Sequence, residues 1–208
     1  MRATTGTGFV LILGCGLAAC GGGSSPSAPS ASLSAVGRLA IAQQIVTTAL
    51  GGVVTGSAAK KSDSVPLGSL TCQKTCTGAS CAVTCPIDES FSCPAGGSAT
   101  DKGQIAGTLD GELSGEAALA ATQGYAGCKP NAGLTIEGAP ATTATGNARF
   151  VKGQLTDEQT VRIAGAVSYT STTEGSGRCD VDIRVTFNRA LKGSASGTAC
   201  GQAVDVAF

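Results

Sequence analysis

The clearest pattern in the chain is a strict alternation of apolar and polar residues in its second half. In residues 179–187, four apolar side chains alternate with four polar ones: Val181, Ile183, Val185 and Phe187 against Asp180, Asp182, Arg184 and Thr186. Successive side chains of a strand point to opposite faces of its sheet, so this period predicts a half-buried strand. Residues 160–172 repeat the pattern, and residues 103–109 and 133–138 are weaker copies of it.

Short strands joined by glycine-rich turns predict a mainly β fold for residues 94–208, an antiparallel β-meander of about six to eight strands. The pair Asp110-Gly111 predicts a two-residue hairpin turn, because both central residues of such a turn take positive φ. The apolar face of this sheet must be covered. Either a helix packs on the curved sheet, or the sheet closes into a sandwich or a partial barrel.

One segment, residues 34–51, has the period of an amphipathic helix. Its apolar side is expected to hold Leu39, Ile41, Ala42, Ile45, Val46, Ala49 and Leu50, and its polar side Gln43, Gln44, Thr47 and Thr48. We expect Ser34 to cap the start of the helix and Gly51 its end. The polar side lacks the Lys and Arg that interfacial helices use to bind anionic lipid, so we expect the apolar side to pack on the sheet rather than on a membrane.

Composition limits what such a fold can bind and bury. The chain has 14 basic and 14 acidic residues, so it carries no net charge and lacks the basic surplus typical of nucleic-acid-binding proteins. Only 3% of the residues are aromatic, there is no Trp, and 31 residues are Gly. Because each buried methylene contributes only about 0.8 kcal/mol, a core of small side chains is thin and is expected to need covalent support.

The first twenty residues predict the compartment. The apolar run from Phe9 to Ala19 is shorter than the roughly 20 residues of a membrane-spanning helix, so residues 1–19 are interpreted as an export signal. The end of this signal, Leu17-Ala18-Ala19-Cys20, resembles the lipobox of bacterial lipoproteins. The alternative is an ordinary secretory signal, cut after an Ala-x-Ala-like site, that leaves Cys20 unmodified.

The lipobox resemblance implies that the Cys20 thiol receives a diacylglyceryl group, that the signal is cut before Cys20, and that the new amine is acylated. Gly21 stands where an Asp usually signals retention in the inner membrane, so the sequence resembles the outer-membrane class. The implied protein is lipid-anchored in the outer membrane of a Gram-negative bacterium, with a folded domain that is periplasmic or on the cell surface. Several acyl chains on one residue make such an anchor durable.

Two segments have the composition of linkers. Residues 20–33 follow the lipobox and are rich in Gly, Ser and Pro, so we expect a flexible tether with a root-mean-square reach of about 20 Å. Residues 52–70 are expected to form a second linker, between the helix and the first cysteines of the folded part.

Ten cysteines indicate a disulfide framework. Cys15 leaves with the signal and Cys20 carries the lipid, so eight remain, an even number outside the reducing cytoplasm. Positions that face each other across an antiparallel hairpin add to a constant. The first four of the eight form two pairs with one such sum, centred on the turn TGAS, so residues 71–93 are expected to form a hairpin with two disulfides: Cys72–Cys85 and Cys76–Cys81.

The same test applied to Cys179 and Cys200 centres a turn on residues 188–191 and predicts a disulfide between the last two strands. Cys93 and Cys128 then pair by elimination. Closing the larger loops is expected to contribute roughly 3 kcal/mol for each disulfide.

A metal site is the alternative for the first four cysteines, because their thiolates resemble the ligands of an all-cysteine zinc site. Common sites of that kind have two residues within each pair, whereas Cys72 and Cys76, and Cys81 and Cys85, enclose three. We therefore expect disulfides, with no metal and no cofactor.

Catalytic chemistry has little support in the sequence. The chain has no His, which excludes Ser-His, Cys-His and His-metal arrangements. Two groups of carboxylates remain, one near a turn and one on a strand face: Asp110, Glu112 and Glu116, and Asp180 with Asp182. Alternation along a strand produces such pairs by itself, so we interpret them as a solvated face rather than as acid-base groups or Ca²⁺ ligands.

These observations favour a membrane-anchored envelope lipoprotein with a non-enzymatic structural or partner-binding role, which contacts the membrane through its N-terminal lipid and binds no nucleic acid. The alternative is a carrier or chaperone that binds a lipid or another apolar ligand in a cavity between the curved sheet and the helix. A large cavity lined by Val, Ile and Phe would favour the carrier, and a filled core would count against it.

Overall fold

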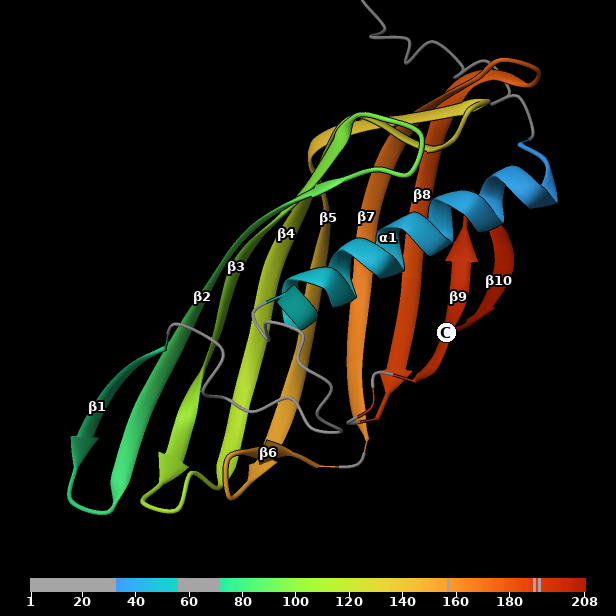
Figure 1. Ribbon diagram of the computed structural model, residues 1–208. Coiled ribbons are helices and arrows are strands. Elements are labelled where there is room, and N and C mark those ends of the chain that lie inside the picture. Colours follow the sequence, from blue (N-terminus) through green and yellow to red (C-terminus); the bar gives the residue numbers. More distant parts are fainter. Residues whose placement is uncertain (1–32, 56–71, 157, 189, 191) are drawn as a thin grey trace, which may run out of the picture.

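The computed structural model describes residues 33–55, 72–156, 158–188, 190 and 192–208. These residues form one helix, α1 (Ala35–Thr55), and a single antiparallel sheet (Figure 1). The sheet contains β1 (Gln73–Thr77), β2 (Ser80–Ser92), β3 (Ser98–Asp110), β4 (Gly115–Asn131), β5 (Leu134–Val151), β6 (Gln154–Leu155), β7 (Gln159–Ser171), β8 (Gly175–Phe187), β9 (Gly193–Ala199) and β10 (Gln202–Ala207).

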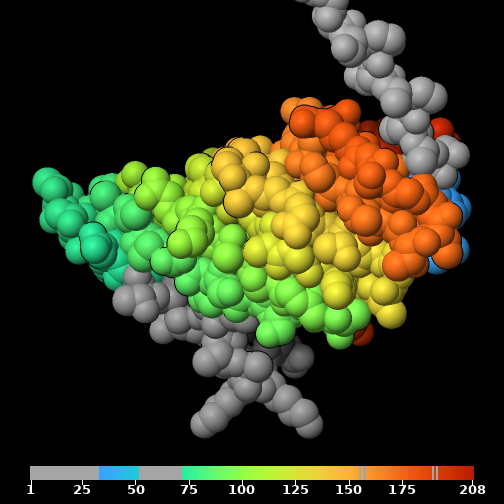
Figure 2. All heavy atoms as spheres, turned by 90° about the horizontal axis from the view of Figure 1, so that it is seen from above, coloured from blue at the N-terminus to red at the C-terminus, as the bar shows by residue number. Residues whose placement is uncertain are grey.

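Nine strands follow one another across the sheet in chain order, and the short β6 pairs only with β5. The predicted antiparallel meander is therefore confirmed, and residues 94–208 contain eight strands, β3 to β10, within the expected six to eight. The hairpin of residues 71–93 is not a separate unit, because all thirteen residues of β2 pair with β3. It forms the first two strands of the same sheet and lies at one narrow end of the molecule (Figure 2).

α1 covers the concave face of the sheet and crosses its strands obliquely (Figure 1). The alternation of the sequence explains why this face is apolar: the four apolar side chains of residues 179–187 are all buried, and their polar neighbours lie on the opposite, convex face. Ile41 and Ile45 of α1 are completely buried against the concave face. A helix, and not closure of the sheet, is the covering element, as the helix amphipathicity predicted.

The helix begins as expected and ends later than expected. The Ser34 hydroxyl accepts a hydrogen bond from the Gly37 N–H at 3.2 Å, and the Ser34 carbonyl accepts one from the Arg38 N–H at 3.0 Å. The predicted end at Gly51 is wrong, because the helix continues to Thr55. Gly51 is needed for packing: a Cβ at this position would lie 2.9 Å from the ring of Phe91.

The connection between β3 and β4 also differs from the expected two-residue turn. It comprises residues 111–114, and its residue with positive φ is Leu113 rather than Gly111. The Asp110 side chain organises this longer loop, because its Oδ1 atom accepts hydrogen bonds from the N–H groups of Glu112 at 2.9 Å and Ser114 at 2.8 Å. Asp side chains often bond to the backbone two residues further on, and here that preference determines the loop.

The eight cysteines of the described residues form four disulfides, Cys72–Cys85, Cys76–Cys81, Cys93–Cys128 and Cys179–Cys200. These are the pairs expected from the sequence. In the first hairpin Cys76 lies directly opposite Cys81, which is the register that the shared sum predicts. Disulfides persist in oxidising compartments, so the four bonds indicate a domain that folds outside the cytoplasm.

The last disulfide has a different environment from the expected one. β8 and β9 pair with Val181 opposite Ala199, so Cys200 is one residue away from the position opposite Cys179. Cys200 lies in the turn between β9 and β10, has a φ of 52°, and donates its N–H to the Asp180 carbonyl at 2.8 Å. The bond therefore joins β8 to that turn, and a further strand, β10, follows it.

Loop length should determine how much each disulfide contributes to stability. Cys93 and Cys128 are 35 residues apart, whereas Cys76 and Cys81 are 5 apart. The entropy that a cross-link removes from the unfolded chain grows with the logarithm of loop length. We therefore expect Cys93–Cys128 to contribute about 2 kcal/mol more to the free energy of unfolding than Cys76–Cys81. Urea unfolding of the paired variants Cys93→Ala/Cys128→Ala and Cys76→Ala/Cys81→Ala would measure this difference, and equal losses of stability would contradict it.

Candidate functional site

A row of polar side chains crosses the otherwise apolar concave face. It consists of four residues that lie opposite one another on successive strands β2 to β5: Glu89, Asp101, Gln123 and Thr142. We call these four residues the polar row. Asp101, Gln123 and Thr142 are at most 1% exposed, and Glu89 is half-buried. Burial of polar groups is costly unless they are hydrogen-bonded, so the partners of this row are informative.

Two further polar residues, both on the helix, are also buried. Gln44 and Thr48 were predicted on the outer side of α1, but they are 8% and 1% exposed, while Leu39, predicted on the apolar side, is 37% exposed. These assignments were wrong because α1 contacts strands from β2 at one side of the sheet to β10 at the other. More than one side of the helix is therefore enclosed by the curved sheet.

Gln123 is the centre of the hydrogen bonds in this region. Its Oε1 atom accepts hydrogen bonds from the Thr142 hydroxyl at 2.6 Å and from the Tyr125 hydroxyl at 3.2 Å. Its Nε2 atom donates to the Ile45 carbonyl of α1 at 3.4 Å. Burial raises the pKa of Tyr125 well above its ordinary range, so this hydroxyl remains a neutral donor. The network ties α1 to β4 and β5.

Asp101 is the exception in the polar row. Its Oδ1 atom is buried and has no hydrogen-bond partner among the described residues. Burial, together with a smaller contribution from the charge of Glu89 on the neighbouring strand, raises the pKa of Asp101 to about 7. The residue opposite on β4 is the neutral Gln123, and no cation contributes to the shift. Asp101 is therefore a buried carboxyl group that exchanges its proton near neutral pH.

The space between α1 and the sheet is filled by side chains. Ile41, Ala42 and Ile45 have no exposed surface, and they belong to one continuous hydrophobic cluster with the apolar residues of the concave face. This observation counts against a ligand cavity between the sheet and the helix. A carrier of the form considered from the sequence would need to open this contact.

A groove of about 720 Å³ runs along another side of α1. Gln43, Thr47 and Leu50 of the helix line it, together with Phe91 at the end of β2 and Phe208 after β10. The polar Gln44, Thr48 and Ser92 also line it, and its remaining lining residues are apolar or small: Ala40, Val46, Gly51, Pro94, Pro130, Val206 and Ala207. The groove is a concave apolar surface of the size that small ligands occupy.

The structure does not bring the carboxylates noted in the sequence together into one site. Glu112 and Glu116 are exposed at the β3–β4 end of the sheet. Asp180 and Asp182 lie on the convex face and form ion pairs with Arg178 at 3.1 Å and with Arg162 at 2.9 Å. Within the described ranges, no three His, Cys, Asp or Glu side chains are grouped so that they could hold a metal ion. Cys20 lies outside the described residues.

The polar row was not predicted from the sequence, because these residues were not compared with the apolar-polar alternation of the strands that contain them. Glu89 has the same parity as the buried Cys85 and Ile87 of β2, and Asp101 has the same parity as Ala99 and Ile105 of β3. Parity alone thus places both carboxyl groups on the inner face. Their position opposite each other depends on the register between the two strands, which sequence reasoning did not derive.

Comparisons of the chain with models of protein families, with curated proteins and with solved structures found no match. Within the part of the chain that the structure describes, no helix combines the length and the apolar character needed to span a membrane.

The raised pKa of Asp101 predicts an unusual pH dependence of stability. The folded protein holds this proton up to about pH 7, whereas an unfolded Asp releases it near the ordinary pKa of 3.8. Between these two values the folded state binds more protons, so its stability should fall with rising pH, by up to about 1.4 kcal/mol per pH unit, and the effect should level off above pH 7. Asp101→Asn, which keeps the shape and cannot ionise, should remove this slope and be the more stable form at pH 8.

Urea unfolding between pH 4 and pH 8 would measure the effect as the difference between wild type and Asp101→Asn. Asp88→Asn is the matched control, because Asp88 is an adjacent but exposed carboxylate that pairs with Lys102 on the convex face. It should retain the wild-type slope. If Asp101→Asn and wild type respond to pH in parallel, Asp101 does not carry its proton in the folded state.

Proposed function

We propose that this protein is a lipid-anchored module of the bacterial outer membrane with a non-enzymatic role, and that it binds a partner on the convex face of its sheet. The observation that carries the proposal is the division between the two faces. α1 fills the concave face, whereas side chains on the convex face of β5, β7 and β8 point to solvent.

The anchor is supported by residues 1–33. Leu17-Ala18-Ala19-Cys20 resembles a lipobox, Gly21 resembles the outer-membrane class, and a Gly/Ser/Pro tract follows before the folded part begins. The four disulfides agree with this assignment, because they indicate an oxidising compartment such as the one a lipoprotein reaches. The lipid and the disulfides thus imply the same cellular route.

A role in binding is supported by the character of the convex face. Its exposed positions are rich in hydroxyl side chains, among them Thr143, Thr145, Thr160, Ser168 and Thr170. β5, β7 and β8 are 18, 13 and 13 residues long, and their register is nearly continuous. A surface that is already ordered loses little conformational entropy on association, so even a polar face of this kind can bind a partner.

A non-enzymatic role is supported by the side chains that the chain offers. The sequence contains no His, and all eight cysteines of the described residues are used in disulfides. The groups that most often act as general base or as thiol nucleophile are therefore missing or blocked.

The groove along α1 favours a second candidate function, a carrier for a lipid or another apolar ligand. In this version the ligand lies on the outer side of the helix, between Phe91 and Phe208, and not between helix and sheet. The two candidates use different surfaces of the same folded domain.

The anchor predicts a specific mass and a specific cellular fraction. Mature protein purified from membranes should begin at Cys20 and carry acyl chains on this residue, whereas Cys20→Ser should lose the lipid and leave the membrane fraction. Intact mass measurement and membrane fractionation would test both statements. An unmodified Cys20, or a Cys20→Ser protein that remains with the membrane, would refute the anchor.

Photo-cross-linking in cells should distinguish the two binding surfaces. A photoreactive residue at Thr145, which is exposed on the convex face, should form cross-links to a protein partner if the convex face binds one. The same residue at Thr47, which lines the groove, should form adducts with lipid if the protein is a carrier. Mass spectrometry of the products identifies the class of partner, and adducts at Thr47 alone would replace the first proposal by the second.

A further inference from the structure

Two arginines lie directly opposite each other on the convex face. Arg162 on β7 is the cross-strand neighbour of Arg184 on β8. Like charges at opposed positions of a sheet repel each other, so such a pair is destabilising unless something neutralises it. The residues opposite this pair on the two flanking strands are neutral, Thr145 on β5 and Ser196 on β9.

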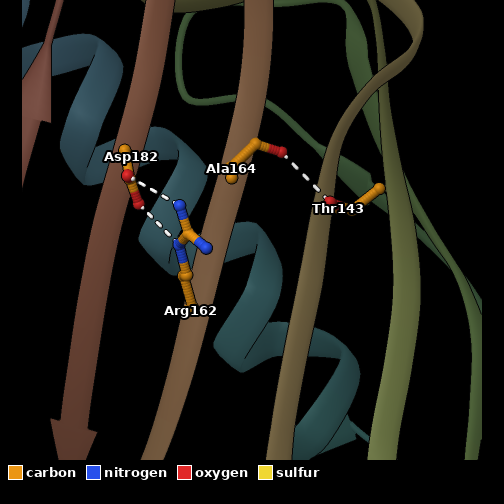
Figure 3. A network of polar contacts seen from close by, with 4 residues as sticks. All are labelled: Thr143, Arg162, Ala164 and Asp182. Carbon is orange, nitrogen blue, oxygen red and sulfur yellow. Dashed lines mark hydrogen bonds and ion pairs between the residues drawn. The ribbon is translucent and has the colours of Figure 1, made fainter.

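Asp182 neutralises only one of the two arginines by direct contact. Arg162 donates hydrogen bonds from Nε to Asp182 Oδ1 and from Nη2 to Asp182 Oδ2, both at 2.9 Å. Figure 3 shows the Arg162 side chain reaching from its own strand to Asp182, while Thr143 bonds to the Ala164 carbonyl on the other side. The hydrogen bond from Arg162 lowers the pKa of Asp182, which therefore remains ionised and holds the guanidinium in one orientation.

Arg184 has no hydrogen bond and no ion pair among the described residues, although it lies near Asp182. It borders a shallow depression of about 460 Å³ together with Arg162, Asp182, Ser196, Gly197 and Thr198. Gly197 has a φ of 155°, and a Cβ at this position would lie 2.1 Å from the Asp182 carbonyl oxygen. The absence of a side chain here is therefore imposed by the neighbouring backbone of β8.

We propose that this depression is a binding site for a phosphate-type oxyanion, and that Arg162, Arg184, Ser196 and Thr198 recognise it. The ligand is a phosphate group, either free in solution or in the headgroup of an anionic lipid.

The donors around the depression match this chemistry. A guanidinium has five N–H donors and no acceptor, and Asp182 uses two of those on Arg162, so three remain there and five on Arg184. Ser196 and Thr198 add hydroxyl donors on the neighbouring strand. Two arginines and one aspartate leave one net positive charge, so an anion is favoured over a cation. An anion would also remove the repulsion between the two guanidinium groups.

Calorimetric titration of the folded protein with inorganic phosphate tests the site, with Arg184→Gln as the test variant. The matched control is Arg178→Gln, because Arg178 is an exposed arginine on the same face of the same strand, pairs with Asp180 and lies outside the depression. We expect Arg184→Gln to weaken phosphate binding by about tenfold or more, as loss of a charged hydrogen-bond donor should. Arg178→Gln should change it by less than about twofold. Circular dichroism and thermal unfolding verify that both variants remain folded.

A flotation assay separates the two sources of phosphate. It uses Cys20→Ser protein, so that no lipid anchor contributes, with vesicles of phosphatidylcholine alone or mixed with phosphatidylglycerol. Binding to the mixed vesicles that Arg184→Gln loses and Arg178→Gln retains assigns the site to a lipid headgroup, whereas a response to inorganic phosphate alone assigns it to the free ion. The proposal is overturned if neither probe binds, or if both variants weaken binding equally. These outcomes do not depend on the anchor or on a protein partner.

Discussion

The structure depends on the close contact between α1 and short side chains on the concave face of the sheet. At six buried positions of this face the residue is alanine: Ala99, Ala117, Ala121, Ala144, Ala195 and Ala199. Short side chains allow a helix to approach the strands closely, and the curved sheet then contacts it from β2 to β10. Gly51 does the same from the side of the helix, since the ring of Phe91 takes the place of its missing side chain. The close approach of α1 to the sheet thus compensates for the small apolar area that each side chain of this core buries.

The same closeness explains the buried polar groups. An enclosed helix cannot turn its whole polar side to water, so Gln44 and Thr48 are buried. Gln44 Nε2 donates a hydrogen bond to the Thr48 hydroxyl, and the Thr48 hydroxyl donates one to the Gln44 carbonyl. On the sheet, Gln123 accepts a hydrogen bond from Tyr125 and donates one to the Ile45 carbonyl of α1. Hydrogen-bonded networks of this kind specify one arrangement of the elements, because a shifted helix would leave donors and acceptors unpaired. Asp101 remains outside this network and is accommodated by keeping its proton. The interior therefore combines a fixed register with one group that responds to pH.

Strand periodicity and cysteine spacing predicted the local features of this fold well. Val181 to Phe187 alternate as the strand requires, and Cys76 lies opposite Cys81 because a hairpin has a single register once its turn is known. The predictions that were wrong concerned contacts between distant segments. Gly51 looked like a helix end because its contact with Phe91 cannot be read from neighbouring residues. Cys200 departed from the simple hairpin register because the chain turns there into β10.

For the polar row, parity could have placed each residue on the inner face, but only the pairing of β2 to β5 brings the four together. The depression bordered by Arg162 and Arg184 likewise depends on the pairing of neighbouring strands. Arg162 and Arg184 are 22 positions apart, and nothing in either strand alone indicates that they face each other. Sites made by neighbouring strands follow from register, and register is a property of the whole sheet.

The place where the folded domain begins has a mechanical consequence for the proposed anchor. Leu33 is only 3% exposed, and the Ser34 N–H donates a hydrogen bond to Glu174 at the turn between β7 and β8. A tether attached at Cys20 would therefore pull on a buried side chain and on the start of a 21-residue helix, not on the free edge of a strand. Such a load spreads along α1 to many strands at once and does not peel them apart one by one. The proposed anchor would therefore hold the domain at one of its most widely connected elements.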